Sequence, residues 1–346
     1  MNLLILGGSV FVGHHIVRAA VASGHSVTMV TRGRHLAGVV KGVDHVIRDR
    51  RGDLSDLAQR RWDAVIDTCG YRPEVVSASA SALRRSVDIY VFISSASVYP
   101  VFSRPYVAED SPVWSPTWDR SVSARDPIGY GQLKVACESE VRSVFADSAA
   151  ILRPGLIVGP GDSTDRFGYW PVRFAWPGPV LGPGPGNAPV QFTDVRDHAA
   201  FVLKICETRT AGTFNIMTPA NAMSMGSVLK ACASHAGSGD ANEIVWVEPS
   251  LLDAYHVRPW TELPLWVGSD PARRYMMAAS SARAVAAGLT FRSLSETVQD
   301  TLSWELARGG PFPRPGQLNP IKEQLLLQVA RDEPEYLGYD ADIQPL

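Results

Sequence analysis

The chain has 346 residues, with 33 Lys and Arg against 35 Asp and Glu, a formal charge of −2, and 45% hydrophobic residues. This composition excludes a disordered chain, which has fewer apolar residues and a larger net charge. The near-zero charge argues against a general nucleic-acid binder, because such proteins carry a basic surplus. The length predicts one large domain or two closely packed ones.

The cysteines and the apolar segments indicate a cytoplasmic protein. The four cysteines form no CxxC pair and no spacing typical of metal ligands, so we expect free thiols in a reducing compartment and no metal site. No apolar run reaches the ~20 residues that a membrane span needs. The apolar start meets glycine at once, so we expect a strand there rather than a signal peptide, and no membrane contact.

Short apolar runs alternate with helical patterns over the first half of the chain. Residues 3–6 are wholly apolar and precede a helical pattern that ends near Gly24, and further apolar runs follow at 27–30, 64–67 and 89–94. Continuous apolar strands separated by helices are typical of a parallel sheet covered on both faces. We therefore predict an α/β fold with a doubly wound parallel sheet of the Rossmann type.

The second half of the chain differs in composition and predicts a smaller, interleaved C-terminal substrate lobe. Residues 1–160 and about 190–207 are expected to form the dinucleotide-binding domain. The lobe is expected to comprise about 161–189, which is rich in Pro and Gly, and 212–310. The extension 311–346 contains one amphipathic helix, and the sequence assigns it no role.

A glycine-bearing turn joins the first strand to the first helix. In it, Gly7 can make a tight turn and Gly13 can let the helix lie close to the sheet. A helix that begins at such a turn is typical of a pyrophosphate site, because its first N–H groups point at the anion. The turn predicts these cofactor contacts: Gly7, Ser9, Val10, Phe11, Val12 and Gly13.

At this turn the sequence resembles the extended short-chain dehydrogenases/reductases, the NAD-dependent epimerase/dehydratase family. That family carries GxxGxxG here, and Val10 replaces the middle glycine, so we expect crowding of the pyrophosphate. The resemblance continues through residues 152–162 and 190–197 and covers most of 1–305. It implies a nicotinamide dinucleotide cofactor and further contacts from Pro154 and Gly155.

The end of the second strand favours NADP(H), with NAD(H) as the alternative. Thr31, Arg32 and Arg34 stand there without an acidic residue, and two guanidiniums can bind a 2′-phosphate and stack on adenine. A solvated basic loop is the other interpretation. The resemblance implies the remaining contacts, near the adenine and the ribose: Asp49, Arg50, Cys69, Gly70 and Tyr71.

Tyr130 and Lys134 form a YxxxK motif, whose spacing places both side chains on one helix face. The ammonium and an oxidised nicotinamide both favour the phenolate and so lower the pKa of the phenol toward neutrality, and Tyr130 can then exchange a proton with a substrate oxygen. In the resembling family an upstream Ser or Thr binds the same oxygen, and that position is Ser95. We predict Ser95, Tyr130 and Lys134 as the catalytic residues, with Ser94 beside the cofactor and Ala96 beside the substrate.

The reaction is predicted from departures from the family pattern. Ala96 and Ser97 stand where dehydratases carry Asp-Glu, and Leu156 stands where sugar-nucleotide epimerases carry Asn. We predict an NADP(H)-dependent reductase or dehydrogenase acting on a small ketone, aldehyde or secondary alcohol. The alternative is an NAD-dependent sugar or sugar-nucleotide epimerase with transient oxidation. A third class is a non-catalytic nucleotide-fold or RNA-binding protein. The evidence for it is the basic segment 32–61, which has eight Lys and Arg against four Asp.

Aromatic residues of the second half predict the substrate pocket. Tyr169 and Trp170 follow the end of the sheet in sequence, and Trp260 lies in a tryptophan-rich stretch. Aromatic walls suit an apolar or ring-bearing substrate, although packing of the lobe is the alternative role for each. We expect a small-molecule substrate, no nucleic-acid partner, and, from the frequency of twofold oligomers, a homodimer.

Overall fold

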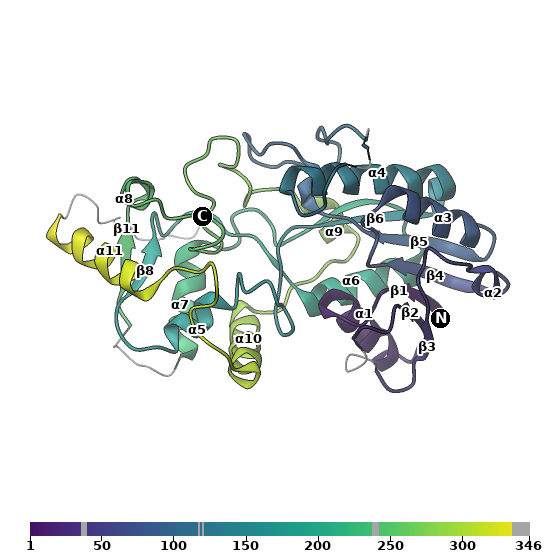
Figure 1. Cartoon of the computed structure of the whole chain (residues 1–346), viewed down its shortest axis with the longest axis horizontal. Helices are drawn as coiled ribbons and strands as arrows, with labels where there is room; N and C mark the ends of the chain where they lie inside the picture. Colours follow the sequence, from purple (N-terminus) through teal and green to yellow (C-terminus); the bar gives the residue numbers. More distant parts are fainter. Residues whose placement is uncertain (36–39, 117, 120, 237–241, 334–346) are drawn as a thin grey trace.

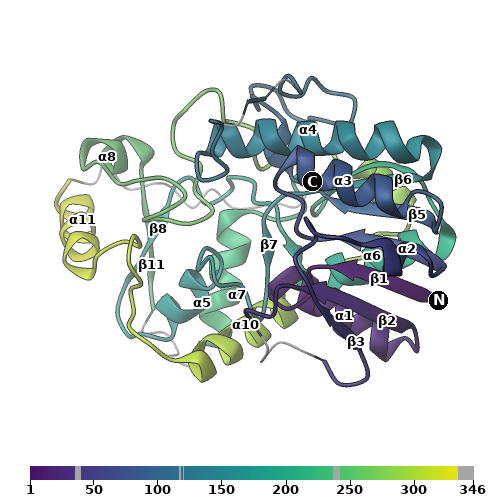
Figure 2. The same ribbon diagram turned by 45° about the vertical axis from the view of Figure 1, so that its right-hand side comes forward.

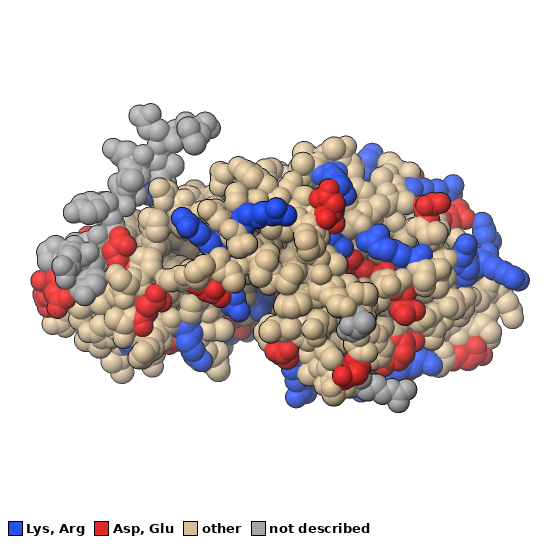
Figure 3. All heavy atoms as spheres, turned by 90° about the horizontal axis from the view of Figure 1, so that it is seen from above, with Lys and Arg blue, Asp and Glu red and all other residues tan. Residues whose placement is uncertain are grey.

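The computed structural model describes residues 1–35, 40–116, 118–119, 121–236 and 242–333. Two parts lie side by side in it, a sheet flanked by helices and a second, mainly helical lobe that ends in α11 (Figures 1 and 2). Basic and acidic side chains are interspersed over the face seen in Figure 3. None of the helices among the described residues has the length and apolar character to cross a membrane.

A seven-stranded parallel sheet forms the first part, in the order β10-β6-β5-β4-β1-β2-β3. The order reverses next to β1, which pairs with β2 on one side and with β4 on the other, and this point is where open α/β sheets bind ligands. The predicted doubly wound fold is therefore confirmed. The strands are β1 (Asn2–Leu6), β2 (Ser26–Thr31), β3 (Asp44–Ile47), β4 (Trp62–Asp67), β5 (Val87–Ile93), β6 (Ala149–Pro154) and β10 (Gly212–Ile216).

Helices cover both faces of the sheet, which explains the continuous apolar strands. Successive side chains of a strand point to opposite faces: Leu3 and Ile5 pack against one set of helices, and Leu4 and Leu6 against the other. The first set is α1 (Phe11–Ala22), α6 (Val195–Thr208) and α9 (Ala282–Ala286). The second set is α2 (Ser55–Ala58), α3 (Pro73–Leu83) and α4 (Pro127–Phe145).

The second lobe has its own buried core, built from α5, α7, α8, α10, α11 and a parallel pair of strands, β8 and β11. Its elements come from both sides of α6 in the sequence, so the lobe is interleaved with the sheet domain. Their bounds are α5 (Tyr169–Phe174), β8 (Val180–Pro183), α7 (Met225–His235), β11 (Ile244–Val247), α8 (Pro249–Ala254), α10 (Leu294–Arg308) and α11 (Pro320–Asp332). Short elements complete the chain: η2 (Ala96–Val98), η3 (Ala146–Ser148), β7 (Ile157–Val158) and β9 (Thr193–Asp194).

The structure corrects the expected domain boundary at residue 207. Strand β10 was expected in the lobe, yet it pairs with β6 from Gly212 to Ile216 and extends the sheet. Its sequence mixes glycine, threonine and asparagine with two apolar residues, as an edge strand can, so no apolar run marked it. The amphipathic helix of the extension is α11, which packs Leu326 and Ala330 into the lobe core; residues 334–346 lie outside the described ranges.

Candidate active site

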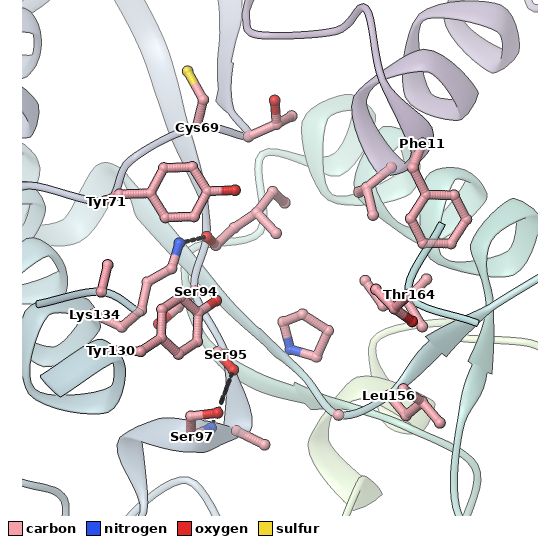
Figure 4. A pocket seen from close by; sticks show the side chains of 18 of the residues that line it. Phe11, Cys69, Tyr71, Ser94, Ser95, Ser97, Tyr130, Lys134, Leu156 and Thr164 are labelled. Atoms are coloured by element: carbon pink, nitrogen blue, oxygen red, sulfur yellow. Dashed lines mark hydrogen bonds between the residues drawn. The ribbon is translucent and has the colours of Figure 1, made fainter. Parts of the chain in front are cut away.

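A cleft of about 1290 Å³ runs along the carboxyl ends of the central strands and reaches the second lobe. Its walls include the residues that directly follow β1, β4 and β5, namely Gly7, Thr68 and Ser94. Figure 4 shows Tyr71, Lys134, Tyr130 and Ser95 along one wall and Phe11, Thr164 and Leu156 across from them. The cleft therefore connects the glycine turn at one end with the predicted catalytic residues.

The glycine turn requires glycine at its first and last positions. Gly7 has φ +102°, and a Cβ there would lie 2.1 Å from Thr68 Oγ1. A Cβ on Gly13 would lie 2.6 Å from the Gly8 Cα, so α1 can approach the turn only without that side chain. Helix α1 begins after Val10, which provides no side-chain cap, and its first turn holds no acidic residue. Its first N–H groups, which α-helices leave without intrahelical acceptors, are suited to an anion.

The side chains of Val10 and Phe11 in the turn line the cleft and are not part of the buried hydrophobic core. Val10, at the position of the family's middle glycine, lines the cleft and is 51% exposed. Phe11 has φ +32°, and its ring lies edge-on to His15. His15 shares a hydrogen bond with the Pro160 carbonyl oxygen at 2.8 Å. Phe11 thus stands where the first helix meets the segment that leads into the lobe.

Lys134 of helix α4 is surrounded by backbone carbonyl groups and aromatic rings. The side chain is 2% exposed, and its Nζ donates to the carbonyl oxygens of Gly70 at 2.9 Å and Ile93 at 2.8 Å. The ammonium also lies 4.8 Å from the centroid of the Tyr71 ring and 4.9 Å from that of Phe92. These contacts hold a positive charge at one position in the cleft wall.

Tyr130 and Ser95 lie next to that charge (Figure 4). Burial raises the pKa of Tyr130 above its ordinary value of 10, while a hydrogen bond with Ser95 and the charge of Arg166 lower it. The Lys134 ammonium is 5.9 Å from the centroid of the phenol ring. The lowering of this pKa toward neutrality by Lys134 together with an oxidised nicotinamide stays a prediction. In the protein alone, the raised pKa keeps Tyr130 in its phenol form at neutral pH.

Ser95 is positioned by the short helix that follows β5. It is the N-cap of η2, and its Oγ accepts a hydrogen bond from Ser97 N and donates one to Ser97 Oγ, both at 3.1 Å. Ser94 differs, because its Oγ donates to Glu138 Oε1 at 2.6 Å behind the cleft wall. Ser94 thus lines the cleft, but its hydroxyl fastens α4 to the end of β5.

Sequence reasoning missed a buried ion pair between Glu138 and Arg153, which also attaches α4 to the sheet. Arg153 of β6 donates to both carboxylate oxygens of Glu138, at 2.9 and 2.7 Å, and to Tyr99 Oη at 3.0 Å. The available signal was the spacing of Tyr130, Lys134 and Glu138, which are four residues apart on one face of α4. The pair therefore holds helix α4 against strand β6 of the sheet.

Most predicted cofactor residues do line the cleft. These are the six residues of the glycine turn together with Thr31, Arg32, Arg34, Asp49, Arg50, Cys69, Tyr71, Ser94, Tyr130, Lys134, Pro154 and Gly155. Gly70 is absent from the lining among the described residues. A Cβ on it would lie 2.4 Å from the Phe92 ring, and its carbonyl oxygen holds Lys134, so it serves packing and positioning.

Two charged members of this set already have partners within the protein. Arg50 donates to both oxygens of the buried Asp67, at 2.5 and 2.7 Å, and so acts as a structural ion pair in the cleft wall. Asp49 accepts from Arg51 Nη2 at 2.7 Å, and this guanidinium holds the pKa of Asp49 below its ordinary value. Arg32 and Arg34, at the end of β2, are exposed and form no ion pair within the described part of the chain.

The predicted substrate residues divide between the cleft and the lobe core. Ser95, Ala96 and Trp260 line the cleft. Tyr169 and Trp170 do not, because α5 turns both rings into the lobe core, where Trp170 is fully buried and donates from Nε1 to the Pro264 carbonyl at 2.9 Å. Sequence reasoning missed other residues at this end of the cleft: Thr164, Arg166, Gln191, Met217, Met276 and Met277.

A doubly wound sheet with a glycine turn after its first strand, and Ser, Tyr and Lys at the strand ends, defines the class of extended short-chain dehydrogenases/reductases. Residues 3–216 match the NAD dependent epimerase/dehydratase family, and the chain belongs to this family of enzymes.

Relatives with known names are distant. The Arabidopsis thaliana chloroplast stem-loop binding protein of 41 kDa b is 28% identical over 271 residues, covering 73% of this chain and 67% of that protein. The 3-diazoavenalumate denitrifying reductase of Streptomyces sp. is 25% identical over 244 residues, or 62% of this chain and 75% of that protein.

Solved structures with the same fold include a UDP-glucose 4-epimerase. That structure has a TM-score of 0.66 and 18% identity, and the match covers 91% of this chain and all of that one. The UDP-glucuronic acid 4-epimerase of Bacillus cereus in complex with NAD has a TM-score of 0.60 and 17% identity, covering 88% and 98%. At these identities the likeness shows a common fold.

Proposed function

We propose that this protein binds a nicotinamide dinucleotide along the cleft and supports reversible hydride transfer at a secondary carbinol or carbonyl carbon of a small molecule. The observation that carries this proposal is the meeting of Ser95, Tyr130 and Lys134 in one cleft with the glycine turn. The family, and the NAD named with the Bacillus cereus structure, support the choice of cofactor.

The residues present fit a dinucleotide. The uncapped start of α1 suits a pyrophosphate, and Gly7 and Gly13 bring backbone rather than side chains to it. Lys134 keeps one of its three N–H donors free of the two carbonyl contacts, which suits a ribose hydroxyl. When bound, such a cofactor supplies the hydride donor or acceptor. The chain's own residues would supply the proton and orient the substrate oxygen.

The proton chemistry follows from Tyr130. In the reducing direction the neutral phenol gives its proton to the substrate oxygen, and Ser95 Oγ holds that oxygen with a hydrogen bond. In the oxidising direction the phenolate must accept the proton of the carbinol. Ser95 and Arg166 stabilise that phenolate, since both lower the pKa of Tyr130.

Two reactions use this chemistry, and we place epimerisation by transient oxidation first. Its support is the family and the sugar-nucleotide epimerases among the solved structures with this fold. Net reduction of a carbonyl is the second candidate. Its support is Leu156, whose apolar side chain lines the cleft at the position of the epimerase asparagine, and the relative named as a reductase.

For the reductase candidate we propose NADP(H) as the cofactor. Arg32 and Arg34 line the cleft at the end of β2 and offer two guanidiniums to a 2′-phosphate. RNA binding, the third class, has less support from the structure than the basic composition of residues 32–61 suggested. Most of the arginines in residues 32–61 pair with carboxylates, as Arg48 does with Asp56 and Arg60 with Asp44.

The experiment is a cofactor assay on the purified full chain. Nicotinamide cofactor released in stoichiometric amount on denaturation supports the epimerase, whereas NADPH consumption in a screen of ketones and aldehydes supports the reductase. In either case Tyr130→Phe should keep cofactor binding and lose about 100-fold or more in turnover. A chain that neither retains nor binds any nicotinamide dinucleotide contradicts the proposed function.

A further inference from the structure

Arg166 lines the cleft next to the predicted catalytic phenol. It is half-buried, and its guanidinium carbon lies 5.6 Å from the centroid of the Trp260 ring. It is close enough to Tyr130 for each to shift the pKa of the other. Within the described residues it makes no hydrogen bond and no ion pair.

The backbone on both sides of Arg166 is firmly held. Asp165 pairs with Arg308 and with Arg314, so its carboxylate is unavailable to Arg166. Phe167 is fully buried, with its ring 4.9 Å from that of Phe192. The guanidinium is therefore presented to the cleft by a segment anchored at each neighbouring residue.

Trp260, which lies beneath the guanidinium, is also held in place. Its backbone has φ +65°, a conformation that a bulky residue rarely adopts, and its N–H donates to the Trp266 carbonyl oxygen at 2.9 Å. A guanidinium that stacks on an aromatic face keeps its N–H groups free at its edge. Arg166 and Trp260 thus form a prearranged donor at the substrate end of the cleft.

Asp162, a carboxylate close enough to act on the pKa of Arg166, forms no ion pair with it within the described residues. Asp162 Oδ1 accepts a hydrogen bond from Thr164 N at 2.8 Å, while its buried Oδ2 has no partner among the described residues. Four other arginines of the cleft wall do pair with a carboxylate, namely Arg48, Arg50, Arg51 and Arg273. The five N–H donors of the half-buried Arg166 guanidinium are therefore available to acceptors on a ligand in the cleft.

We propose that Arg166 binds an anionic oxygen group of the substrate, a carboxylate or a phosphate, and so sets the reacting carbon beside Tyr130 and Ser95. This inference rests on the proposed function, because it assigns the substrate class of the same cleft. The planar guanidinium can take two oxygens of such a group at once, which fixes orientation as well as position. The methionines and Trp260 around it suit an apolar body attached to the anion.

The test is a binding titration of the full chain with three ring compounds that differ in charge: benzoate, phenyl phosphate and neutral benzamide. Calorimetry or the change in tryptophan fluorescence gives the affinity. At least one anion should bind about 10-fold or more tightly than benzamide. The tighter of benzoate and phenyl phosphate identifies the group as a carboxylate or a phosphate.

Variants then locate the interaction. Arg166→Gln should weaken anion binding about 10-fold or more, and Arg166→Lys, which keeps the charge without the fork, should weaken it less. Arg125→Gln is the matched control, because it removes an exposed arginine from the wall of the same cleft. Equal weakening by Arg125→Gln, or benzamide binding as tightly as both anions, would overturn the proposal.

Two further variants separate the alternatives. If Arg166 serves only to neutralise Asp162, the effect of Arg166→Gln should vanish in an Asp162→Asn background, and that result would also overturn the proposal. Tyr130→Phe should leave anion affinity unchanged. If anion binding depends on Arg166 but no hydride transfer is found, the proposed function fails while this assignment of Arg166 stands.

Discussion

Lys134 Nζ lies 2.9 Å from the carbonyl oxygen of Gly70, so helix α4 is tied to the chain that leaves β4. The two residues are far apart in the sequence and come from neighbouring layers of the fold. Gly70 can take this role because a side chain there would collide with Phe92. Gly70, which was predicted to contact the cofactor, positions the Lys134 ammonium through its backbone carbonyl.

Lys134→Met should therefore impair both binding and turnover. It removes the ammonium and, with it, the proposed hydrogen bond to the cofactor ribose. One charge-assisted hydrogen bond is worth about 1.5–3 kcal/mol, so we expect about a 10- to 100-fold loss in turnover and weaker cofactor binding. Steady-state kinetics together with cofactor titration measures the two effects. A variant with normal cofactor affinity and normal turnover would show that the charge has no role.

The pKa of Tyr130 predicts opposite pH dependences for the two directions of reaction. Because burial raises this pKa above its ordinary value, the phenol form needed for reduction is fully present at neutral pH and is lost only as pH rises through the raised pKa. The phenolate needed for oxidation grows about 10-fold per pH unit below that pKa. Oxidation should accelerate with pH while reduction stays level.

The profile of kcat/KM against pH in both directions tests this prediction. Arg166→Gln should move the rise in oxidation to higher pH, since Arg166 lowers the pKa of Tyr130. An oxidation profile that is already level near neutral pH would show that positive charge in the loaded cleft outweighs the burial of the phenol.

Arg32→Ala combined with Arg34→Ala tests the choice between NADP(H) and NAD(H). Both arginines line the cleft at the end of β2, where no acidic residue accompanies them. If they bind the 2′-phosphate, NADPH affinity should fall about 10-fold or more while NADH affinity changes little. Direct titration of both cofactors measures this. Equal losses of NADPH and NADH affinity would show that the two arginines do not bind the 2′-phosphate.

Glu138→Gln should lower the free energy of unfolding by about 3 kcal/mol. It breaks a buried pair and leaves the Arg153 guanidinium, which is also buried, without its carboxylate. Glu140→Gln on the same helix is the control, because the Glu140 carboxylate forms no ion pair within the described residues, and it should change stability by less than about 0.5 kcal/mol. Chemical denaturation gives both values, and similar changes for the two variants would argue against a fastening role.

Trp170→Ala should act on the stability of the lobe rather than on the cleft. The side chain is fully buried, so its removal should cost about 3–5 kcal/mol while cofactor affinity stays unchanged. Trp260→Ala, which removes a cleft residue, should cost less stability and weaken anion binding at Arg166. Thermal unfolding and the benzoate titration distinguish the two positions. If Trp170→Ala weakened benzoate binding and Trp260→Ala caused the larger loss of stability, Trp170 would belong to the substrate pocket.

The sequence by itself determined the features that depend on short stretches of chain. The apolar runs of β1, β2, β4 and β5 and the glycine turn follow from local propensity and packing. Tyr130 and Lys134 share a face because 3.6 residues complete a helical turn. Ser95 was predicted from the resemblance to the family, whose serine motif directly follows a buried strand.

Only the tertiary structure decided which charges are free and which are paired. Asp67 pairs with Arg50 and Glu138 pairs with Arg153. Arg166 instead lies over the Trp260 ring and forms no ion pair within the described residues. The same holds for Trp170, whose helix turns toward the lobe core. These outcomes depend on packing between segments far apart in the chain. Spacing places Glu138 on the same helix face as Lys134, but only the fold sets which distant side chains meet.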